Sequence, residues 1–248
     1  MDVNGYWDRV SRDPSDALTV SPFQTWAGKE AWLRRRLQAW TLRLVARRGP
    51  PRPLRAVDLG CGFGDFAAQL APMCADLTAV DFAPGFVAQA QARLRATGHP
   101  SARAERGDLR DYDRFAEVDL VHLGAVCMYL EEDELARVYQ RVRERLRPDG
   151  VVIQREYTVV GLGRQYLRDR GEYKSWQRRA HRYHALARHA GLELIEQRHG
   201  PTIYGEELAR AAPSWLGHAL AWPGRALGRL ALGAMTHTST TMVFSPRY

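Results

Sequence analysis

The sequence predicts an α/β fold in which a mostly parallel, doubly wound sheet carries helices on both faces. Short apolar runs alternate with segments of helical periodicity over residues 54–154. Three alternating glycines follow the first apolar run, and an acid ends the second. Because parallel strands need a crossover, usually a helix, this alternation favours right-handed βαβ units. With 248 residues, 45% of them hydrophobic, the chain can bury one substantial core.

The individual elements follow from the spacing of apolar residues. We expect strands at residues 54–59, 77–80, 102–105, 118–123 and 151–154, and helices at 84–96 and 132–146. In the last third of the chain we expect a helix at 175–189 and strands at 192–196 and 241–244.

Residues 24–48 have the pattern of an amphipathic helix. Leu33, Leu37, Trp40 and Leu44 follow one another at steps of four, three and four residues. The pattern ends in two arginines, which favour a helix C-terminus, followed by a glycine and two prolines. We expect this helix to form an N-terminal cap outside the sheet.

The chain is basic, with a net charge of +8 and a pI near 9.7. Such a chain can bind nucleic acid or an anionic membrane surface. However, all basic residues except Lys29 and Lys174 are arginine, and no short run alternates basic and aromatic residues as a single-strand binding platform does. The pattern favours an ordinary arginine-rich surface, and a nucleic-acid partner is not favoured.

The three cysteines, Cys61, Cys74 and Cys127, are too few and too far apart for a disulfide framework or a zinc cluster. The sequence has no metal-ligand spacing, so we expect no metal. It has neither a signal-peptide pattern nor an apolar run of 18 residues, so we expect a cytoplasmic protein.

Three alternating glycines, Gly60, Gly62 and Gly64, follow the first predicted strand. Without Cβ atoms they let a ligand approach the backbone and permit a tight turn from strand to helix. Dinucleotide-binding loops place the third glycine one residue later, and phosphate-binding loops end in lysine and a hydroxyl residue. This loop lacks that lysine and is flanked by Asp58 and Asp65, so it suits a nucleoside joined to a positively charged group.

Two further acids follow later strands. Asp81 comes 23 residues after Asp58, at the end of the second strand, where a carboxylate can accept both hydrogen bonds of a ribose diol. Asp108 follows the third strand, where a carboxylate can accept a hydrogen bond from an adenine amino group. The alternative is a structural glycine turn in an unrelated α/β domain whose acids cap helices.

These features resemble the class I methyltransferase family, which uses S-adenosylmethionine (SAM). The resemblance implies a seven-stranded Rossmann-like sheet, SAM as cofactor and methyl transfer as the activity. It assigns the cofactor to the loop, the two later acids and their neighbours: Asp58, Gly60, Cys61, Gly62, Gly64, Asp81, Phe82, Asp108, Leu109 and Leu123. The sequence departs from many relatives at Met128, where they carry histidine, and at Gly124, where some amino-methylating relatives carry asparagine.

The catalytic candidates lie at the ends of the fourth and fifth strands, because ligands bind outside the carboxyl ends of open α/β sheets. They are His122, Tyr129, Arg155, Glu156 and Tyr157. Methyl transfer depends mainly on alignment, and a base is needed only for an acceptor that holds its proton tightly. We expect Arg155 or Glu156 to orient a polar acceptor, with a solvated strand end as the alternative. His122 is alternatively a hydrogen-bonded residue packed under a helix, and Tyr129 a core residue.

Residues 161–176 resemble a lid-like connection of small-molecule methyltransferases. Tyr166, Tyr173 and Trp176 either form an acceptor wall there or cover the core. We expect this segment and the N-terminal helix to cover the pocket.

Residues 211–235 form an apolar insertion with Arg225 and Arg229 four residues apart. A helix packed on the body or in a dimer interface is favoured over one that lies on a membrane surface or closes over the acceptor. We expect a monomer or a homodimer.

The sequence therefore predicts a single domain, residues 1–248, that transfers a methyl group from SAM to oxygen or nitrogen of a small-molecule biosynthetic intermediate. Within it we expect a cap (1–50), a SAM-binding core (54–160) and an acceptor-side segment (161–248). The alternatives are an RNA- or peptide-modifying methyltransferase and a SAM-binding partner subunit without catalysis.

Overall fold

The computed structural model describes residues 3–12, 27–115, 117–159, 165–169, 171, 173–203 and 237–247. Its main strands are β1 (Leu54–Leu59), β2 (Cys74–Asp81), β3 (Ala102–Arg106), β4 (Val118–Gly124), β5 (Leu146–Val159), β8 (Leu192–Ile203) and β9 (His237–Pro246). The helices are α1 (Val3–Arg12), α3 (Ala27–Arg48), α4 (Asp65–Leu70), α5 (Pro84–Ala96), α6 (Glu132–Arg145) and α7 (Ala180–His189), with 3-10 turns η3 (Ala71–Met73) and η4 (Cys127–Tyr129). A separate hairpin pairs β6 (Tyr166–Asp169) with β7 (Lys174–Gln177).

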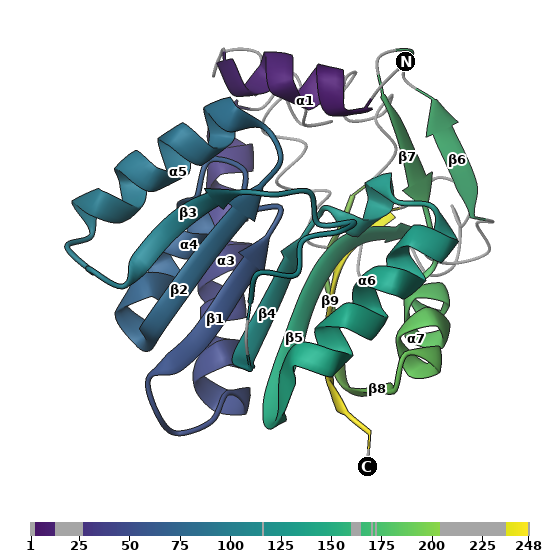
Figure 1. Cartoon of the computed structure of the whole chain (residues 1–248). Coiled ribbons are helices and arrows are strands. Elements are labelled where there is room, and N and C mark those ends of the chain that lie inside the picture. Colours follow the sequence, from purple (N-terminus) through teal and green to yellow (C-terminus); the bar gives the residue numbers. More distant parts are fainter. Residues whose placement is uncertain are drawn as a thin grey trace.

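The seven main strands form one sheet in the order β3-β2-β1-β4-β5-β9-β8 (Figure 1). Neighbouring strands from β3 to β5 are parallel, and β9 is antiparallel to both β5 and β8. The predicted fold, a mostly parallel seven-stranded sheet with helices on both faces, is confirmed.

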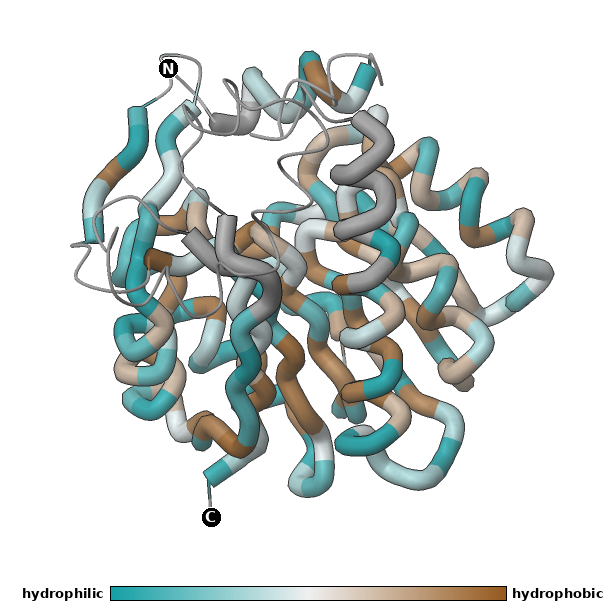
Figure 2. Tube along the Cα trace, turned by 180° about the vertical axis from the view of Figure 1, so that it is seen from behind, coloured by the Kyte–Doolittle hydropathy of each residue, from teal (hydrophilic) through white to brown (hydrophobic). Residues whose placement is uncertain are grey.

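The central strands β1, β4 and β5 are buried on both faces, and alternate residues face two hydrophobic layers. In β1, Val57 and Leu59 pack in the layer of α6 and α7, whereas Ala56 packs in the layer of α3 and α4. Figure 1 shows α6 in front of the sheet and α3 behind it, and Figure 2 shows the apolar central strands from behind. Burial on both faces explains why these strands appear in the sequence as continuous apolar runs.

Helix α6 shows how local sequence sets the boundaries of an element. It begins at a capping box in which the side chains of Glu131 and Glu134 each accept the other residue's backbone N–H. Three acids occupy its first turn and two arginines its last, which matches the helix dipole at both ends. Its observed range agrees with the predicted one to within one residue.

The register of the parallel strands brings their carboxyl ends to one edge of the sheet. Asp58 of β1 pairs with Ala79 of β2 on one side and with His122 of β4 on the other. The loop after β1, the residue Asp81 and the turn after β4 therefore lie at the same edge. This is the edge at which open α/β sheets bind ligands.

The prediction of a helix over residues 175–189 is wrong in its first five residues. Residues 175–177 belong to β7, where Trp176 pairs with Leu167 of β6, and α7 begins only at Ala180. Pairing with β6, which ends at Asp169 shortly before β7 begins, decides the conformation here, and helical periodicity alone does not reveal it.

Helix α1 was not predicted, and it lies over the carboxyl edge of the sheet (Figure 1). Ser11 packs so closely on α5 that a Cβ at Gly85 would lie 2.4 Å from its hydroxyl oxygen, and Gln89 Nε2 donates to the Ser11 carbonyl at 2.9 Å. Helix α3, in contrast, packs Leu44 and Val45 on a face of the sheet. The covering position therefore belongs to α1.

Three expectations fall partly or wholly outside the described residues. The insertion at 211–235 lies outside them, as do residues 24–26 of the first predicted helix and 161–164 of the lid-like segment. Among the described helices, none combines the length and the apolar character that a bilayer crossing requires.

Candidate active site

The glycine loop connects β1 to α4 at the carboxyl edge of the sheet. The N–H groups of Gly60 and Cys61 both donate to the Val80 carbonyl, at 2.8 and 3.0 Å, which ties the loop to β2. At Gly60 φ is 76°, and a Cβ there would lie 2.6 Å from Val126 Cγ2. Because Val126 follows β4, the missing Cβ lets the loop and the turn after β4 pack against each other.

Gly62 lies at the open side of the same loop. Its φ is 53°, and no atom of the residues that the structure describes lies within 4 Å of the position of a Cβ. Its N–H donates to Asp81 Oδ2 at 3.0 Å. None of the described residues occupies this point, so a ligand can approach the backbone beside a carboxylate.

Asp81 is the last residue of β2 and lies at the same edge of the sheet as the glycine loop. Its Oδ1 accepts the Ala83 N–H at 3.0 Å, while Oδ2 accepts that of Gly62. Burial raises the pKa of Asp81 to about 6, although these two hydrogen bonds favour the charged form. A largely buried anion therefore stands next to the open side of the glycine loop.

Asp58 and His122 form a buried pair behind the loop. His122 Nδ1 lies 2.7 Å from Asp58 Oδ1, and the imidazole stacks on Phe66 of α4 with ring centroids 3.9 Å apart. Asp58 Oδ2 is buried and has no hydrogen-bond partner among the described residues. These contacts match the alternative in which His122 is a hydrogen-bonded strand residue under a helix.

Two other predicted acids have arginine partners within the chain. Asp65, at the start of α4, forms an ion pair with Arg93 of α5. Asp108 accepts hydrogen bonds from the backbone and the guanidinium of Arg110. Burial alone would raise the pKa of Asp108, but the bonds from Arg110 outweigh it and the pKa lies below its ordinary value. The charges of Asp65 and Asp108 are therefore each paired with an arginine.

The remaining predicted cofactor residues surround this edge at different depths. Leu109 and Leu123 are buried in the core layer of α6 and α7, and Phe82 packs against the cluster under α1. Burial, and then the charges of Asp58 and Asp81, raise the pKa of the Cys61 thiol well above its ordinary value. Cys61 is therefore an un-ionised thiol on the loop.

The turn after β4 is held against β5. Ala125 has a φ of 60°, in the left-handed region, and its N–H donates to the Arg155 carbonyl at 2.7 Å. The Cys127 N–H donates to Glu156 Oε1 at 2.9 Å. Glu156 is fully buried, and this burial raises its pKa to about 7. Glu156 therefore lies beneath η4, and the alternative of a solvated strand end is wrong for this residue.

Aromatic side chains meet at the same edge. The ring of Tyr129 lies 5.3 Å from Trp7 of α1 and 5.9 Å from Tyr173, centroid to centroid, and Tyr6 lies 4.7 Å from Tyr173. Burial raises the pKa of Tyr129 well above its ordinary value, so its hydroxyl stays protonated. Helix α1 and the segment before β7 thus both contact the turn that follows β4.

The other predicted residues of this region are placed differently. Arg155 and Tyr157 are half-buried in β5, next to Thr241 and Ser239 of β9. Of the three expected wall residues, Tyr173 joins the aromatic cluster, Trp176 packs against Arg178, and Tyr166 is exposed on the hairpin.

Two functional candidates, Trp7 and Arg178, were missed in the sequence. Arg178 is fully buried between β7 and α7, and its guanidinium donates to the carbonyls of Cys127 and Leu130 at 3.2 and 2.6 Å. Spacing of Tyr6 and Val10 by four residues was a weak signal for α1. No local signal distinguishes Arg178 from the many exposed arginines.

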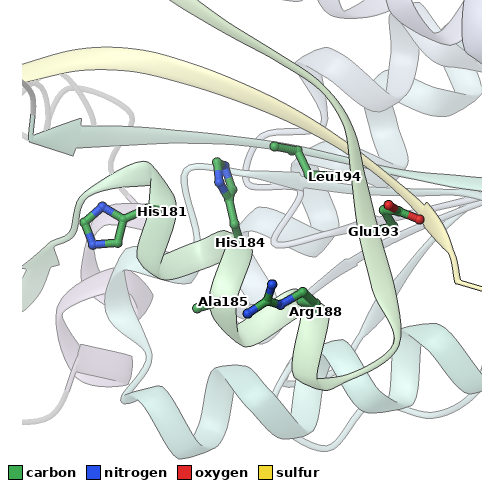
Figure 3. Close-up of a pocket in the computed structure, with 6 residues that line it drawn as sticks. All are labelled: His181, His184, Ala185, Arg188, Glu193 and Leu194. Atoms are coloured by element: carbon green, nitrogen blue, oxygen red, sulfur yellow. The ribbon is translucent and has the colours of Figure 1, made fainter.

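A cavity of about 340 Å³ lies elsewhere, between α7 and β8 (Figure 3). His181, His184 and Arg188 line it from α7, and Glu193 and Leu194 line it from the start of β8. Since β8 runs parallel to β5, its start lies at the amino edge of the sheet. This cavity is therefore separate from the glycine loop and its acids.

Comparison with known proteins agrees with this geometry. Residues 56–150 match the model of a methyltransferase domain family, which covers the glycine loop, Asp81 and the turn after β4. The match covers 95 of the 248 residues, so the chain is similar to methyltransferases over this part of its length. A 91-residue stretch is 32% identical to Nodulation protein S of Sinorhizobium fredii, over 37% of this chain and 40% of that protein. The curated relatives are matched over only 38–56% of their own lengths.

Solved structures share the family fold along most of the chain. The N-methyltransferase NodS of Bradyrhizobium japonicum, in complex with S-adenosyl-L-homocysteine (SAH), has a TM-score of 0.62 at 15% identity and covers 99% of this chain and 98% of that one. An O-methyltransferase from a polyketide synthase multienzyme of Brevibacillus brevis, also with SAH, has a TM-score of 0.64 at 13% identity, with 97% and 79% covered. At these identities the likeness concerns the fold.

Proposed function

We propose that this chain binds SAM at the carboxyl edge of the sheet and transfers its methyl group to oxygen or nitrogen of a small molecule. The observation that carries the proposal is the combination at Gly62 and Asp81. The Cβ position of Gly62 is open, and the buried carboxylate of Asp81 lies one hydrogen bond away from its N–H. A nucleoside with a diol needs such a bare backbone and such an anion.

The residues present fit SAM. Asp81 is suited to hold the ribose hydroxyls, and Asp108, with Leu109 beside it, to meet the adenine. Asp58 adds a negative charge behind the loop, where one of its oxygens has no partner among the described residues. This charge favours a ligand that carries an ammonium and a sulfonium. When bound, SAM supplies an activated methyl group.

On the acceptor side the chain works mainly by positioning. Tyr129, Trp7 and Tyr173 bring aromatic surface to the edge where the β4 and β5 strands end. Such a surface excludes water and orients an acceptor, which accelerates a displacement without a base. The half-buried Arg155 and Tyr157 are the polar candidates there. Glu156 and His122 act from beneath this surface, since both are buried and hydrogen-bonded.

The small-molecule acceptor is supported by the nature of the similar structures. One is an N-methyltransferase and one an O-methyltransferase, so both acceptor atoms remain in the proposal. An RNA or peptide acceptor is the second candidate from the sequence, and no contact described above favours it. Labelling of cell extract with radioactive SAM tests this point. Label that survives ribonuclease and protease treatment but is lost with the small-molecule fraction supports the proposal.

The cofactor site is tested by a matched pair of glycine substitutions. Gly62 and Gly98 both have positive φ, 53° and 73°, and neither has an atom within 4 Å of its Cβ position. Alanine at either position therefore costs about 1–2 kcal/mol of folding stability through backbone strain alone. Gly98 follows α5, away from the loop, so only Gly62→Ala should also weaken SAH binding in calorimetry. Equal SAH affinities of the two variants would refute the proposed site.

A further inference from the structure

The turn η4 lies between the cofactor loop and the aromatic cluster. Val126, directly before it, packs on Gly60, where a Cβ would come within 2.6 Å. Tyr129, its last residue, contacts Trp7 and Tyr173. A shift of η4 therefore moves Tyr129 relative to the glycine loop.

Two buried side chains, one acidic and one basic, hold this turn. The carboxylate of Glu156 accepts the Cys127 N–H at 2.9 Å, and the guanidinium of Arg178 donates to the carbonyls of Cys127 and Leu130. The Glu156 carboxyl group thus holds the N–H side of the turn and the Arg178 guanidinium its carbonyl side. We refer to Glu156 and Arg178 as the η4 clamp.

Both members of the η4 clamp have no exposed surface. Buried charges are costly unless they are paired and hydrogen-bonded. Glu156 Oε2 and Arg178 Nε have no hydrogen-bond partner among the described residues, although Arg178 Nε lies 4.0 Å from Glu132 Oε1 at the start of α6. Two apolar side chains of similar size would fill the same space without this cost. The polar groups of Glu156 and Arg178 therefore serve a purpose other than packing.

The backbone before the clamp is strained. Ala125 is the single non-glycine residue with positive φ in the described part of the chain. Such strain persists only where surrounding contacts enforce it, and it gathers at functional sites. The clamp, together with the bond from Ala125 to the Arg155 carbonyl, supplies those contacts.

We infer that Arg178 and Glu156 are positioning residues that fix η4 so that Tyr129 faces the acceptor. They act through the turn, because their polar atoms bond its backbone. This inference rests on the proposed function for its catalytic consequence. Its structural consequence, the placement of Tyr129, can be measured without any acceptor.

The test places 3-fluorotyrosine at position 129 and follows its fluorine resonance by NMR. Arg178→Lys keeps the charge, but a single ammonium group cannot replace the planar guanidinium that donates to the carbonyls of both Cys127 and Leu130. Glu156→Gln keeps an oxygen for the Cys127 N–H and removes the charge. We expect the Tyr129 line to move or broaden in both variants. Arg188→Ala, an exposed arginine of α7 away from η4, is the matched control and should leave the line unchanged.

A second label at Tyr112, whose hydroxyl bonds Glu105 of β3, monitors the rest of the fold. A Tyr129 line that stays unchanged in Arg178→Lys would overturn the inference. Loss of both lines together in the two variants would overturn it as well, because the pair would then support the whole fold rather than the turn.

Turnover gives the second readout, with the small-molecule acceptor fraction that wild-type protein labels from radioactive SAM. We expect Arg178→Lys to lower kcat about tenfold, the scale of one lost hydrogen bond to a charged group, and to leave the SAM KM and the SAH Kd nearly unchanged. A parallel loss of SAH affinity would contradict the positioning role. Failure of wild-type protein to bind SAH or to label any acceptor would refute the proposed function and leave the fluorine result standing.

Discussion

The most direct test of the cofactor assignment is the replacement of Asp81. Its carboxylate is 7% exposed and accepts two backbone N–H groups, one from the glycine loop. Asp81→Ala removes a charged hydrogen-bond acceptor, which is worth about 1.5–3 kcal/mol. At 1.4 kcal/mol for each factor of ten, SAH should bind about 10- to 150-fold more weakly. Calorimetry with SAH measures this directly.

The pH dependence of binding adds an independent signature of the same residue. Burial raises the pKa of Asp81 to about 6, and a ribose diol needs the ionised form as acceptor. Affinity should therefore be lost as the pH falls through 6. With about nine-tenths of the carboxyl ionised at pH 7 and about one-tenth at pH 5, SAH binding should weaken about tenfold between these values.

Asp81→Asn separates charge from shape. Its amide oxygen can still accept the Ala83 N–H, but it carries no charge and does not titrate. The variant should bind weakly at both pH values, and any pH dependence that it retains belongs to other groups. Wild-type affinity that is equal at pH 5 and pH 7, or an Asp81→Ala variant with unchanged affinity, would refute the ribose assignment.

Two further predictions concern the turn after β4. Burial raises the pKa of Glu156 to about 7 from an ordinary value of 4.5. Glu156 therefore holds its proton more tightly in the folded protein than in the unfolded chain. The free energy of unfolding falls as the pH rises from 4.5 to 7. Urea unfolding of Glu156→Gln should lack this decline, which is on the order of 3 kcal/mol at most; identical pH profiles would contradict it. Ala125→Gly should raise the unfolding free energy by roughly 0.5–1 kcal/mol, because glycine tolerates the φ of 60° but loses more entropy on folding. A lower value in urea melts would argue against strain at Ala125.

The parts of the fold that the sequence predicts are those with a local cause. β1 and α5 have the predicted boundaries, since continuous apolar runs mark strands buried on both faces and a proline marks the first turn of α5. The glycine loop and Asp81 are likewise local, because each follows a strand directly. The parallel register then brings them to one edge.

The parts that escaped prediction depend on contacts between distant residues. Arg178 reaches carbonyls 51 and 48 positions earlier in the chain, and its burial depends on the packing of β7, α7 and η4 together. The false helical start has a different, local origin, because residues 175–177 pair with the neighbouring hairpin strand β6. Glu156 was identified as a candidate but expected at a cleft, since nothing local indicates that η4 covers it.

The turn after β4 connects the cofactor half of the site to the acceptor half. Gly60 allows Val126 to pack on the glycine loop, and Gly124 leaves room for the ring of His122, which lies 2.7 Å from the position of a Cβ. His122 in turn holds Asp58 behind the loop. A single turn after β4 thus contacts the cofactor loop on one side and carries Tyr129 on the other. The glycine loop and the turn after β4 pack closely and cannot shift independently. A change that loosens this turn must therefore disturb the alignment of both cofactor and acceptor. A change at Asp81, in contrast, acts on the cofactor side alone.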